Sequence, residues 1–331
     1  MRRVRIGFLL PHYSQKSRSF MPDVVRILAE SGAVVDVIHP PDGMLEVSRV
    51  RVKHDLYVLR HTSGLSLSLA GVLHELGAVI VNPYPVSAAL RDKIIASRIL
   101  QAAGVPTPDT YVVSHPYQLL PLLDSGSLVI KPYQGAGGHH VRIIRTPAEL
   151  ADVNCGREPV FAQRCHPNDG RDRKIYGIGG RLFGVKKIFP RRTEEEKHGE
   201  PFTLTPELCE LAANCGSAFG IDLYGVDIIE SEGTPYVVDM CSIPGFKGVP
   251  DAPQLLAQYF YAAAERAARG EPLSPMAPWP WQTGLSYDVA GQSAGPEAML
   301  LGHIPGVSSG RTLALQGEEP CLCLGQRLLK L

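Results

Sequence analysis

The segment Tyr224–Pro250, YGVDIIESEGTPYVVDMCSIPGFKGVP, constrains the fold more than any other part of the chain. It contains two short apolar runs, at 224–230 and 235–241, which are separated by Ser-Glu-Gly-Thr at 231–234. β-Branched residues on both sides of turn-forming residues predict a β-hairpin. Each run also carries one acid among aliphatic residues, Asp227 in the first and Asp239 in the second.

The length of the turn decides how these two acids lie. A turn with an odd number of residues, centred near Gly233, makes Asp227 and Asp239 face each other across the strand pair, whereas a two-residue turn places them on opposite faces. Facing carboxylates on a buried sheet repel one another, and a divalent cation between them would remove the repulsion. The hairpin therefore leaves two interpretations open, a metal site or two edge-strand acids that point to water.

Length and composition limit the class of protein. At 331 residues the chain is long enough for two or three domains, and its formal net charge of zero argues against a surface that coats nucleic acid. Seven cysteines without a CxxC spacing favour a reducing compartment. Because no segment approaches the roughly 20 apolar residues of a membrane span, we expect a cytoplasmic protein that binds neither nucleic acid nor a membrane.

Strands and helices alternate in the first quarter of the chain. The patterns predict strands at 4–10, 33–38, 56–59 and 78–81, with helices at 20–31 and 66–76. This order is typical of an α/β layer with a parallel sheet, whose ligands bind beyond the carboxyl ends of the strands. The loop 11–17, the pair Arg60-His61 and Asn82 follow strand ends, so each is either a substrate contact or a solvated loop residue. No G-x-G-x-x-G follows the first strand, so a nicotinamide cofactor is not expected.

A glycine-rich loop, Gln-Gly-Ala-Gly-Gly at 134–138, lies between predicted strands at 128–132 and 141–144. Glycines let backbone N–H groups close over an anion, and Lys131 adds positive charge beside the loop. The loop is therefore either a phosphate cradle or a plain flexible hairpin. It is not a Walker loop, because it lacks Gly-Lys-Ser/Thr and a strand follows it.

The second half of the chain continues as an α+β pattern. A strand is predicted at 159–165, a hairpin at 174–187, and helices from Thr205 and over 254–269. The charge-rich segment 191–200 has no core pattern and is expected to be a mobile segment or a lid. From Glu271 the sequence is rich in Pro, Gly and Ser, which predicts an irregular tail.

Taken in order, several of these segments resemble the ATP-grasp superfamily over residues 80–265. They are RDK at 91–93, GVPTPDT at 104–110, VIKPYQGAGGHHV at 129–141, FAQRCHPNDGRDRKIYGIGG at 161–180, and the hairpin at 224–250. The glycine-rich loop at 134–138, here called the flap, and GVPTPDT are similar to RimK-type and glutathione-synthetase-type ligases. The last two segments are also similar to ATP-grasp inositol polyphosphate kinases. The resemblance implies an α/β plus α+β fold: a Rossmann-like N-terminal layer (1–88), two ATP-grasp subdomains (89–160 and 161–270) and the tail (271–331).

The resemblance also implies where ATP and a divalent ion, Mg²⁺ or Mn²⁺, would bind. The lysines, the flap and the carboxylates would hold the phosphates and the metal, the strand at 163–165 would present backbone groups to adenine, and Lys186 and Lys187 would face the transferred phosphoryl group. The residues assigned to the nucleotide are Lys93, Lys131, Gly135, Gly137, Gly138, Gln163, Arg164, Cys165, Asp172, Lys174 and Lys186; those assigned to the metal are Asp227, Asp239 and Cys241; those assigned to catalysis are Lys187, Arg191 and Arg192.

This sequence departs from the family pattern at the metal site. The last metal ligand is usually an asparagine two residues after the second acid, where this chain has Cys241, followed by Ser242. A thiol is a poor ligand for Mg²⁺, so Ser242 or water would have to substitute. The second acid is Asp239 where the ligases usually have Glu, which indicates a shifted or singly occupied site. The Arg-x-Asn of RimK-type ligases is also missing from 191–200.

The resemblance implies an ADP-forming carboxylate–amine ligase, which makes an amide or peptide bond through an acyl phosphate. Its substrates would be a small-molecule or peptide carboxylate and an amine acceptor, with Lys187, Arg191 and Arg192 steadying the acyl phosphate. The alternatives are a small-molecule kinase of the inositol-polyphosphate type and a nucleotide-binding module without catalysis. The few basic residues of the N-terminal layer (Lys16, Arg18, Arg60) favour the ligase. Whether the chain forms a homo-oligomer stays open.

Overall fold

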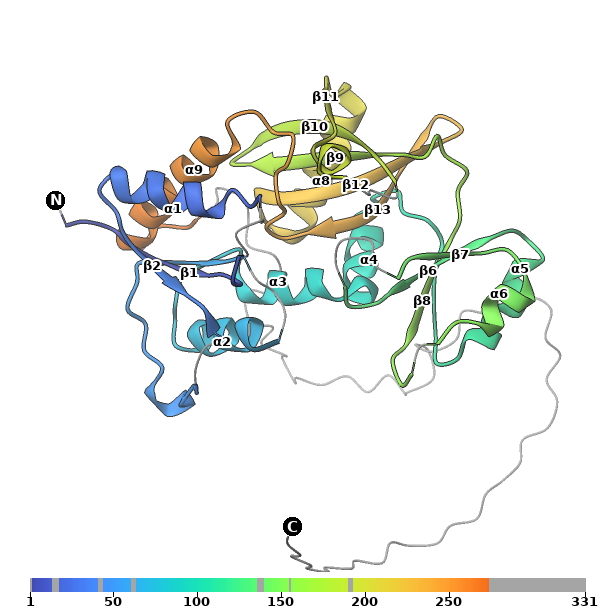
Figure 1. Cartoon of the computed structure of the whole chain (residues 1–331), viewed down its shortest axis with the longest axis horizontal. Helices are drawn as coiled ribbons and strands as arrows, with labels where there is room; N and C mark the ends of the chain where they lie inside the picture. Colours follow the sequence, from blue (N-terminus) through green and yellow to red (C-terminus); the bar gives the residue numbers. More distant parts are fainter. Residues whose placement is uncertain are drawn as a thin grey trace, which may run out of the picture. The chain divides into compact units, whose positions relative to one another are not determined.

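The computed structural model describes residues 2–13, 18–40, 44–60, 64–135, 140–154, 156–189 and 193–273, which belong to one compact unit. In these residues the strands form three sheets, with the orders β2-β1-β3-β4, β5-β8-β6-β7 and β11-β10-β9-β12-β13. Figure 1 shows the first sheet below the third, with the second sheet to one side of both. The expected α/β plus α+β fold class is confirmed.

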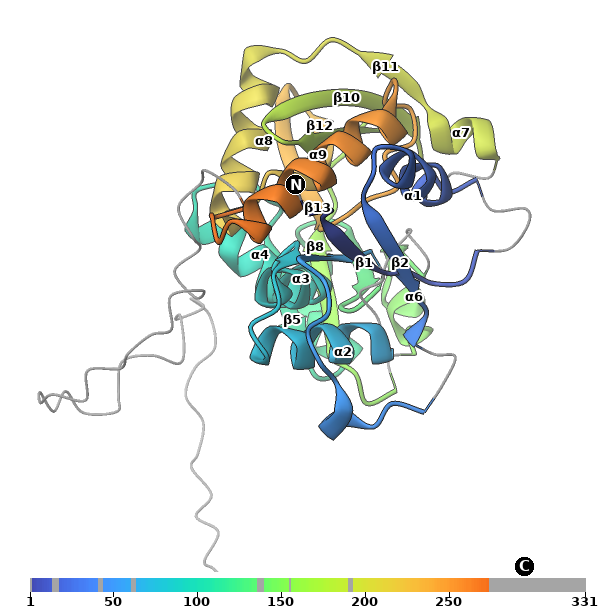
Figure 2. The ribbon, with the colours of Figure 1, turned by 90° about the vertical axis from the view of Figure 1, so that its left-hand side faces the viewer.

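The first sheet is parallel, as predicted. Its strands are β1 (Arg5–Leu9), β2 (Val34–Ile38), β3 (Leu56–Leu59) and β4 (Ile80–Val81). Ile6 and Phe8 of β1 pack with α1 (Met21–Glu30) and α9 (Ala252–Ala268), and Leu9 and the alternate residues of β3 pack with α2 (Gly64–Glu75). The helix α9 therefore comes from far along the chain to cover this layer, beside α1 (Figure 2).

The second sheet is antiparallel and carries the base of the glycine-rich loop. Its strands are β5 (Thr110–Val113), β6 (Leu128–Pro132), β7 (Arg142–Ile144) and β8 (Val160–Arg164). The short helices α5 (Leu120–Leu123) and α6 (Pro147–Ala151), with a 3₁₀ turn at Pro116–Leu119, cover one face. Since β8 pairs with both β5 and β6, the boundary expected between 160 and 161 falls inside a strand of this sheet.

The third sheet is also antiparallel and is backed by α8 (Pro206–Phe219). Its strands are β9 (Arg171–Ile178), β10 (Arg181–Ile188), β11 (Glu200–Phe202), β12 (Leu223–Ser231) and β13 (Thr234–Cys241). From Thr193 onward the segment expected to lack regular structure forms α7 (Glu194–His198) and the start of β11, because Thr193 and Glu196 make a reciprocal capping box.

Two helices join the N-terminal layer to the second sheet. They are α3 (Tyr84–Arg91), which no pattern predicted, and α4 (Lys93–Ala102). The side chain of Asp92 caps α4 by accepting from the backbone N–H groups of Ile94 and Ile95. That cap ends α3 and starts α4 at one residue, so Lys93 is held at the first turn of a helix.

The hairpin of β12 and β13 has a different turn from the one that would make the two acids face each other, yet Asp227 and Asp239 do face each other. Ser231 pairs with Thr234, so the turn has only two residues, Glu232 and Gly233, both with positive φ as type I′ turns require. Such a turn alone would place Asp227 opposite Val238. Instead the register shifts by one residue between Asp227 and Ile228, and Asp227 pairs with Asp239. A β-bulge at Val238, not an odd-numbered turn, therefore makes the two acids face each other.

Candidate active site

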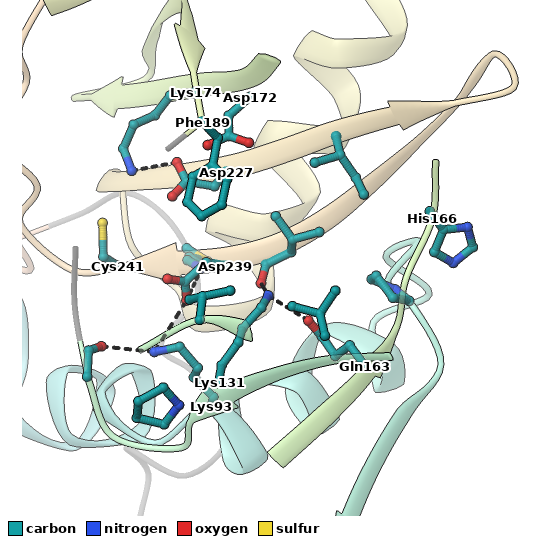
Figure 3. Close-up of a pocket in the computed structure, with 18 of the residues that line it drawn as sticks. Lys93, Lys131, Gln163, His166, Asp172, Lys174, Phe189, Asp227, Asp239 and Cys241 are labelled. Carbon is teal, nitrogen blue, oxygen red and sulfur yellow. Dashed lines mark hydrogen bonds and ion pairs between the residues drawn. The ribbon is translucent and has the colours of Figure 1, made fainter. Parts of the chain in front are cut away.

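A pocket of about 500 Å³ lies where β6, β8, β9, β12 and β13 approach α3 and α4. One end is apolar and is lined by aliphatic side chains, among them Val129, Ile143 and Ile229. The other end gathers lysines and carboxylates from five different elements (Figure 3). This arrangement suits a ligand with a flat apolar part and a strongly anionic part.

Lys131 on β6 connects the second and third sheets. Its Nζ donates to Gln163 Oε1 on β8 at 2.8 Å and to the carbonyl oxygen of Val238 on β13 at 3.0 Å. Val238 is the bulged residue, so the bulge that turns Asp239 toward Asp227 also supplies a partner for Lys131. Burial lowers the pKa of Lys131, and the attraction of Asp239 opposes that effect.

Gln163 was assigned to adenine through its backbone, but its side chain holds Lys131. Its Oε1 accepts from Lys131, and its Nε2 donates to Thr110 Oγ1 at 3.2 Å, which fixes the direction of the amide. The neighbouring backbone N–H groups are also engaged, Arg164 with Asp109 O and Cys165 with Ser127 O. These two N–H groups are therefore not available to a base, although all three residues line the pocket.

We expect that Gln163→Leu weakens ATP binding about tenfold, since Lys131 then keeps only the Val238 carbonyl as a partner and loses its fixed position. Thr110→Val is the matched control. It removes only the hydrogen bond between Gln163 and Thr110, leaves the bond between Gln163 and Lys131, and should change the affinity far less. Calorimetric titration of ATP into the three proteins measures this. Equal affinity of the Leu variant and the original protein would contradict the role given to the amide.

Lys93 holds the base of the glycine-rich loop next to the acidic pair. Its Nζ donates to the carbonyl oxygen of Gly135 at 2.9 Å and lies 3.9 Å from Asp239 Oδ1. Its backbone N–H donates to Tyr133 O, and Asp92 bridges to Gln134, so α4 and the loop base are held together. Gly137 and Gly138 of the flap lie outside the described residues.

The carboxylates Asp227 and Asp239 are each accompanied by a lysine. Lys174 on β9 forms a buried ion pair with Asp227, and Lys93 approaches Asp239 (Figure 3). Burial acts to lower the pKa of Lys174, but the attraction and hydrogen bond of Asp227, together with smaller effects of Cys241 and Tyr176, outweigh it and the pKa is raised. For Asp239, burial raises the pKa, Lys93 opposes this, and the charge of Asp227 adds to it. Asp172 also lines the pocket.

Cys241 lies in the pocket but is not poised to bind a hard cation. Its Sγ lies 3.6 Å from the carbonyl oxygen of Gly225, and burial raises the pKa of the thiol although Lys174 opposes this. The hydroxyl of Ser242, the other expected substitute, is buried and bonded to Asn82 Nδ2 at 2.9 Å and to Ser87 Oγ at 3.2 Å. Both side chains already have neighbours that are not metal ligands.

The two carboxylates fit a metal that arrives with a nucleotide better than a metal held by the protein alone. Across the described residues, no group of three or more His, Cys, Asp or Glu side chains could hold a metal ion, so Cys241 does not complete a three-ligand set. Mg²⁺ is usually bound by one or two carboxylates, with waters and substrate phosphates completing the shell. Asp227 and Asp239 supply those two carboxylates, and three lysines near them suit phosphates.

Neither Lys186, assigned to the nucleotide, nor Lys187, assigned to catalysis, lines the pocket. Lys186 lies over the ring of Phe202, at 5.3 Å from its centroid. Lys187 is buried, and its Nζ donates to Tyr176 Oη at 2.8 Å, to Lys197 O at 2.7 Å and to Lys247 O at 3.1 Å. Lys187 thus ties β10 to α7 and to the loop after β13. Arg191 and Arg192 lie outside the described residues.

This bonding predicts that Lys187→Met lowers the free energy of unfolding by about 2 kcal/mol, since three oxygen acceptors lose a charged donor. ATP affinity should stay unchanged, because Lys187 does not reach the pocket. Lys186→Met on the adjacent, partly exposed position is the control, and it should change stability by less than about 0.5 kcal/mol. Urea denaturation and ATP titration measure the two quantities. A Lys187→Met protein that is as stable as the original but has lost its affinity for ATP would restore the catalytic role of Lys187.

Sequence reasoning missed several residues around this pocket. Ser87, Leu90 and Arg91 of α3 line it, as does His166, whose ring stacks on Tyr236 at 4.1 Å between centroids. The motif RDK drew attention to Arg91 only as a neighbour of Lys93. Ser87 had no signal at all, because its partner Ser242 is 155 residues away in the chain.

The fold agrees with comparisons to known proteins. Residues 90–253 match the RimK-like ATP-grasp domain family. A "probable alpha-L-glutamate ligase" of Parasynechococcus marenigrum (strain WH8102) is 25% identical over 191 residues, which is 54% of this chain and 41% of the relative. This chain therefore matches about two fifths of that relative's length.

Solved structures share the fold over most of the chain. The D-cycloserine synthetase DcsG superposes with a TM-score of 0.63 at 19% identity, covering 80% of this chain and 99% of the synthetase. The ATP-grasp ligase PsnB, solved with a minimal precursor, Mg and ADP, gives a TM-score of 0.59 at 17% identity, with coverage of 80% and 99%. No helix in the described ranges is long and apolar enough to cross a membrane. Residues 90–253 are a RimK-like ATP-grasp domain, and the chain shares the fold of solved ATP-grasp ligases.

Proposed function

We propose that this protein is an ATP- and Mg²⁺-dependent, ADP-forming ligase that joins a carboxylate to an amine. The observation that carries the proposal is the pocket in which Lys93, Lys131 and Lys174 surround the facing pair Asp227 and Asp239. Its support from other proteins is the likeness to ATP-grasp ligases, one of them solved with Mg and ADP. A reducing, cytoplasmic location and self-association remain predictions.

The residues of the pocket have separate tasks in this proposal. Lys93 and Lys131 hold the phosphates. Lys93 also binds the base of the glycine-rich loop through Gly135 O, and Lys131 connects the second sheet to the third through Val238 O. Asp227 and Asp239 would hold Mg²⁺, which would neutralise charge on the phosphate oxygens. The apolar end between Ile143 and Ile229 takes the adenine ring. Positioning and charge neutralisation are the main contributions that a protein makes to phosphoryl transfer.

The chemistry then needs two displacements. A carboxylate oxygen of the acid substrate attacks the γ-phosphorus of ATP, the bond from that phosphorus to the β–γ bridging oxygen breaks, and ADP leaves. The amine nitrogen next attacks the carbonyl carbon of the acyl phosphate, phosphate leaves with the bonding pair, and the amine gives up a proton to yield the amide. Lys174, which is paired with Asp227 at the polar end of the pocket, supplies positive charge near these steps.

The pocket does not favour the kinase alternative. A polyphosphate acceptor needs several unpaired cations beside the transferred phosphoryl group. In the described part of the pocket, Lys93, Lys131, Lys174 and Arg164 already have partners. Too few cations remain for a substrate with many phosphates.

Hydroxylamine trapping tests the proposal. With Mg·ATP, a panel of carboxylic acids and hydroxylamine, the ligase should release ADP and form a hydroxamate in equal amounts with the acid that is its substrate. A kinase would release ADP with a hydroxyl acceptor and form no hydroxamate. ATP binding without ADP release, for any acid or alcohol tested, would leave a nucleotide-binding module and overturn the ligase.

A further inference from the structure

The loop 166–170 leads from the second sheet to the third and lines the pocket on its way. Cys165, the residue before the loop, is still bonded to the second sheet side of the pocket, since its backbone N–H donates to Ser127 O. Arg171, the residue after the loop, begins β9 of the third sheet. Three residues of the loop line the pocket, namely His166, Asn168 and Gly170. The position of this loop therefore helps to set the shape of the pocket.

The start of the loop lies at the apolar end of the pocket. The ring of His166 stacks on the ring of Tyr236, with 4.1 Å between the centroids and 26° between the planes. Tyr236 pairs with Ile229 across the hairpin of β12 and β13, and directly opposed residues of an antiparallel pair project from the same face of the sheet. Ile229 lines the apolar end, and Figure 3 shows His166 on the opposite side of the pocket from Cys241. His166 is therefore beside the place proposed for the base.

The end of the loop is held from the other face of the third sheet. Asp172 and Lys174 of β9 line the pocket, so the side chain of Arg173 between them points to the opposite face. Its Nη2 lies 2.5 Å from Glu230 Oε2 on the neighbouring strand β12. The same Nη2 lies 3.4 Å from Asp169 Oδ2, and Nη1 lies 3.5 Å from Asp169 Oδ1. Arg173 thus joins an acid of the loop to an acid of the sheet.

The geometry of this ion cluster, which consists of Arg173, Asp169 and Glu230, suits a fixed support. The side chain of Arg173 is only 11% exposed, so its charge is largely removed from water and is matched by two carboxylates. It makes two parallel contacts with Asp169, as a planar guanidinium does with a carboxylate. Burial acts to raise the pKa of Asp169, but the backbone N–H of Arg171 and the guanidinium of Arg173 outweigh it and the pKa is lowered.

We infer that Arg173 is a positioning residue for the nucleotide, because with Asp169 and Glu230 it holds the loop 166–170 against the base end of the pocket. This inference rests on the proposed function only in that the pocket binds ATP. Arg173 is not among the described residues that line the pocket, so it acts through the loop. The lysines that would hold the phosphates lie at the polar end. Removing Arg173 should therefore weaken the contacts of the base and leave those of the phosphates.

Two fragments of ATP separate the two ends of the pocket. Adenosine carries the base without the phosphates, and inorganic tripolyphosphate with Mg²⁺ carries the phosphates without the base. For Arg173→Met, calorimetric titration should show about tenfold weaker binding of ATP and of adenosine, with tripolyphosphate binding within about twofold of the original. General damage to the fold would weaken the binding of all three probes.

Further variants test whether Arg173 acts through Asp169. Arg173→Lys should keep part of the affinity for adenosine, because it keeps the charge and loses the two-pronged geometry. Asp169→Asn should weaken adenosine binding by a smaller factor than Arg173→Met, and the double variant should lose no more than Arg173→Met alone. Arg171→Met is the matched control, because the side chain of this neighbouring arginine pairs with the exposed Glu200 at 3.4 Å. It should leave all three affinities unchanged. If Arg173→Met does not fold, Arg173→Lys and Asp169→Asn carry the test.

Each other outcome has a distinct meaning. Equal losses for ATP, adenosine and tripolyphosphate would make the cluster a support of the whole fold and overturn the positioning role. An Arg173→Met protein that binds adenosine as tightly as the original would overturn it too, as would an original protein with no affinity for adenosine. Failure of the original protein to bind ATP would count against the proposed function, and the adenosine titrations would then still decide for or against the role of Arg173.

Discussion

Asp239→Asn is expected to weaken Mg²⁺-dependent ATP binding at least a hundredfold, about 2.7 kcal/mol, without lowering the stability of the protein. Asp239 lies opposite Asp227 and is one of the two carboxylates that fit a divalent ion in this pocket. Asparagine keeps the shape and the oxygen that accepts from the Met240 backbone N–H. It removes only the charge, so the metal loses a hard anionic ligand while the local packing stays the same.

The two effects of this substitution have opposite signs, which makes the test specific. Burial raises the pKa of Asp239 and the charge of Asp227 raises it further, so the ionised carboxylate costs folding free energy in the protein without nucleotide. Lys93 at 3.9 Å offsets only part of that cost. Removing the charge should therefore keep or raise the temperature of unfolding. A substitution that merely damaged the fold would lower both stability and affinity.

Calorimetric titration of ATP with and without Mg²⁺, beside a thermal unfolding scan, measures both effects. Glu232→Gln is the matched control, because Glu232 is an acid on the same hairpin that lies exposed in the turn. It should change neither quantity. An Asp239→Asn protein that binds Mg·ATP as tightly as the original would remove Asp239 from the metal site and leave the ion-pair lysines as the only phosphate contacts.

Much of the site follows from local patterns in the sequence, because those patterns place residues within one element. The strand of Lys131, the hairpin and the presence of one acid on each of its strands are readable from alternation and turn residues. The facing of Asp227 and Asp239 is not readable in the same way. It depends on the bulge at Val238, and no residue type there distinguishes a bulge from a regular pair.

Other features depend on contacts between distant segments. Lys186 and Lys187 are adjacent on β10, so they point to opposite faces, and only the packing of α7 and the loop after β13 decides that Lys187 is buried among carbonyl groups. The helix α3 is short and has a proline in its first turn, and its role comes from Ser87, which meets Ser242 directly after β13. Periodicity within eight residues carries no information about such partners.

Asn82→Leu is expected to lower the free energy of unfolding by about 4 kcal/mol, which is the largest stability effect predicted for this chain. Asn82 is almost fully buried, and its Nδ2 donates to the carbonyl oxygen of Leu223 at 2.7 Å and to Ser242 Oγ at 2.9 Å. These two bonds join the carboxyl end of the first sheet to β12 and to the end of β13. Leucine has a similar volume but no donor, so both acceptors would stay buried without their partner.

The loss should extend to the pocket, because Ser242 is held by the same side chain. Without Asn82, the Ser242 hydroxyl keeps only Ser87, and the segment that carries Cys241 and Ser242 loses its fixed position beside the N-terminal layer. Ser87→Ala is the graded control, since it removes the two longer bonds of the network, to Asn82 O at 3.3 Å and Ser242 Oγ at 3.2 Å, and should cost about 1 kcal/mol. Urea denaturation of the original protein and the two variants measures the order of their free energies of unfolding. If Asn82→Leu proved as stable as Ser87→Ala, the connection between the layers would have to come from the apolar packing of α9 on β1 instead.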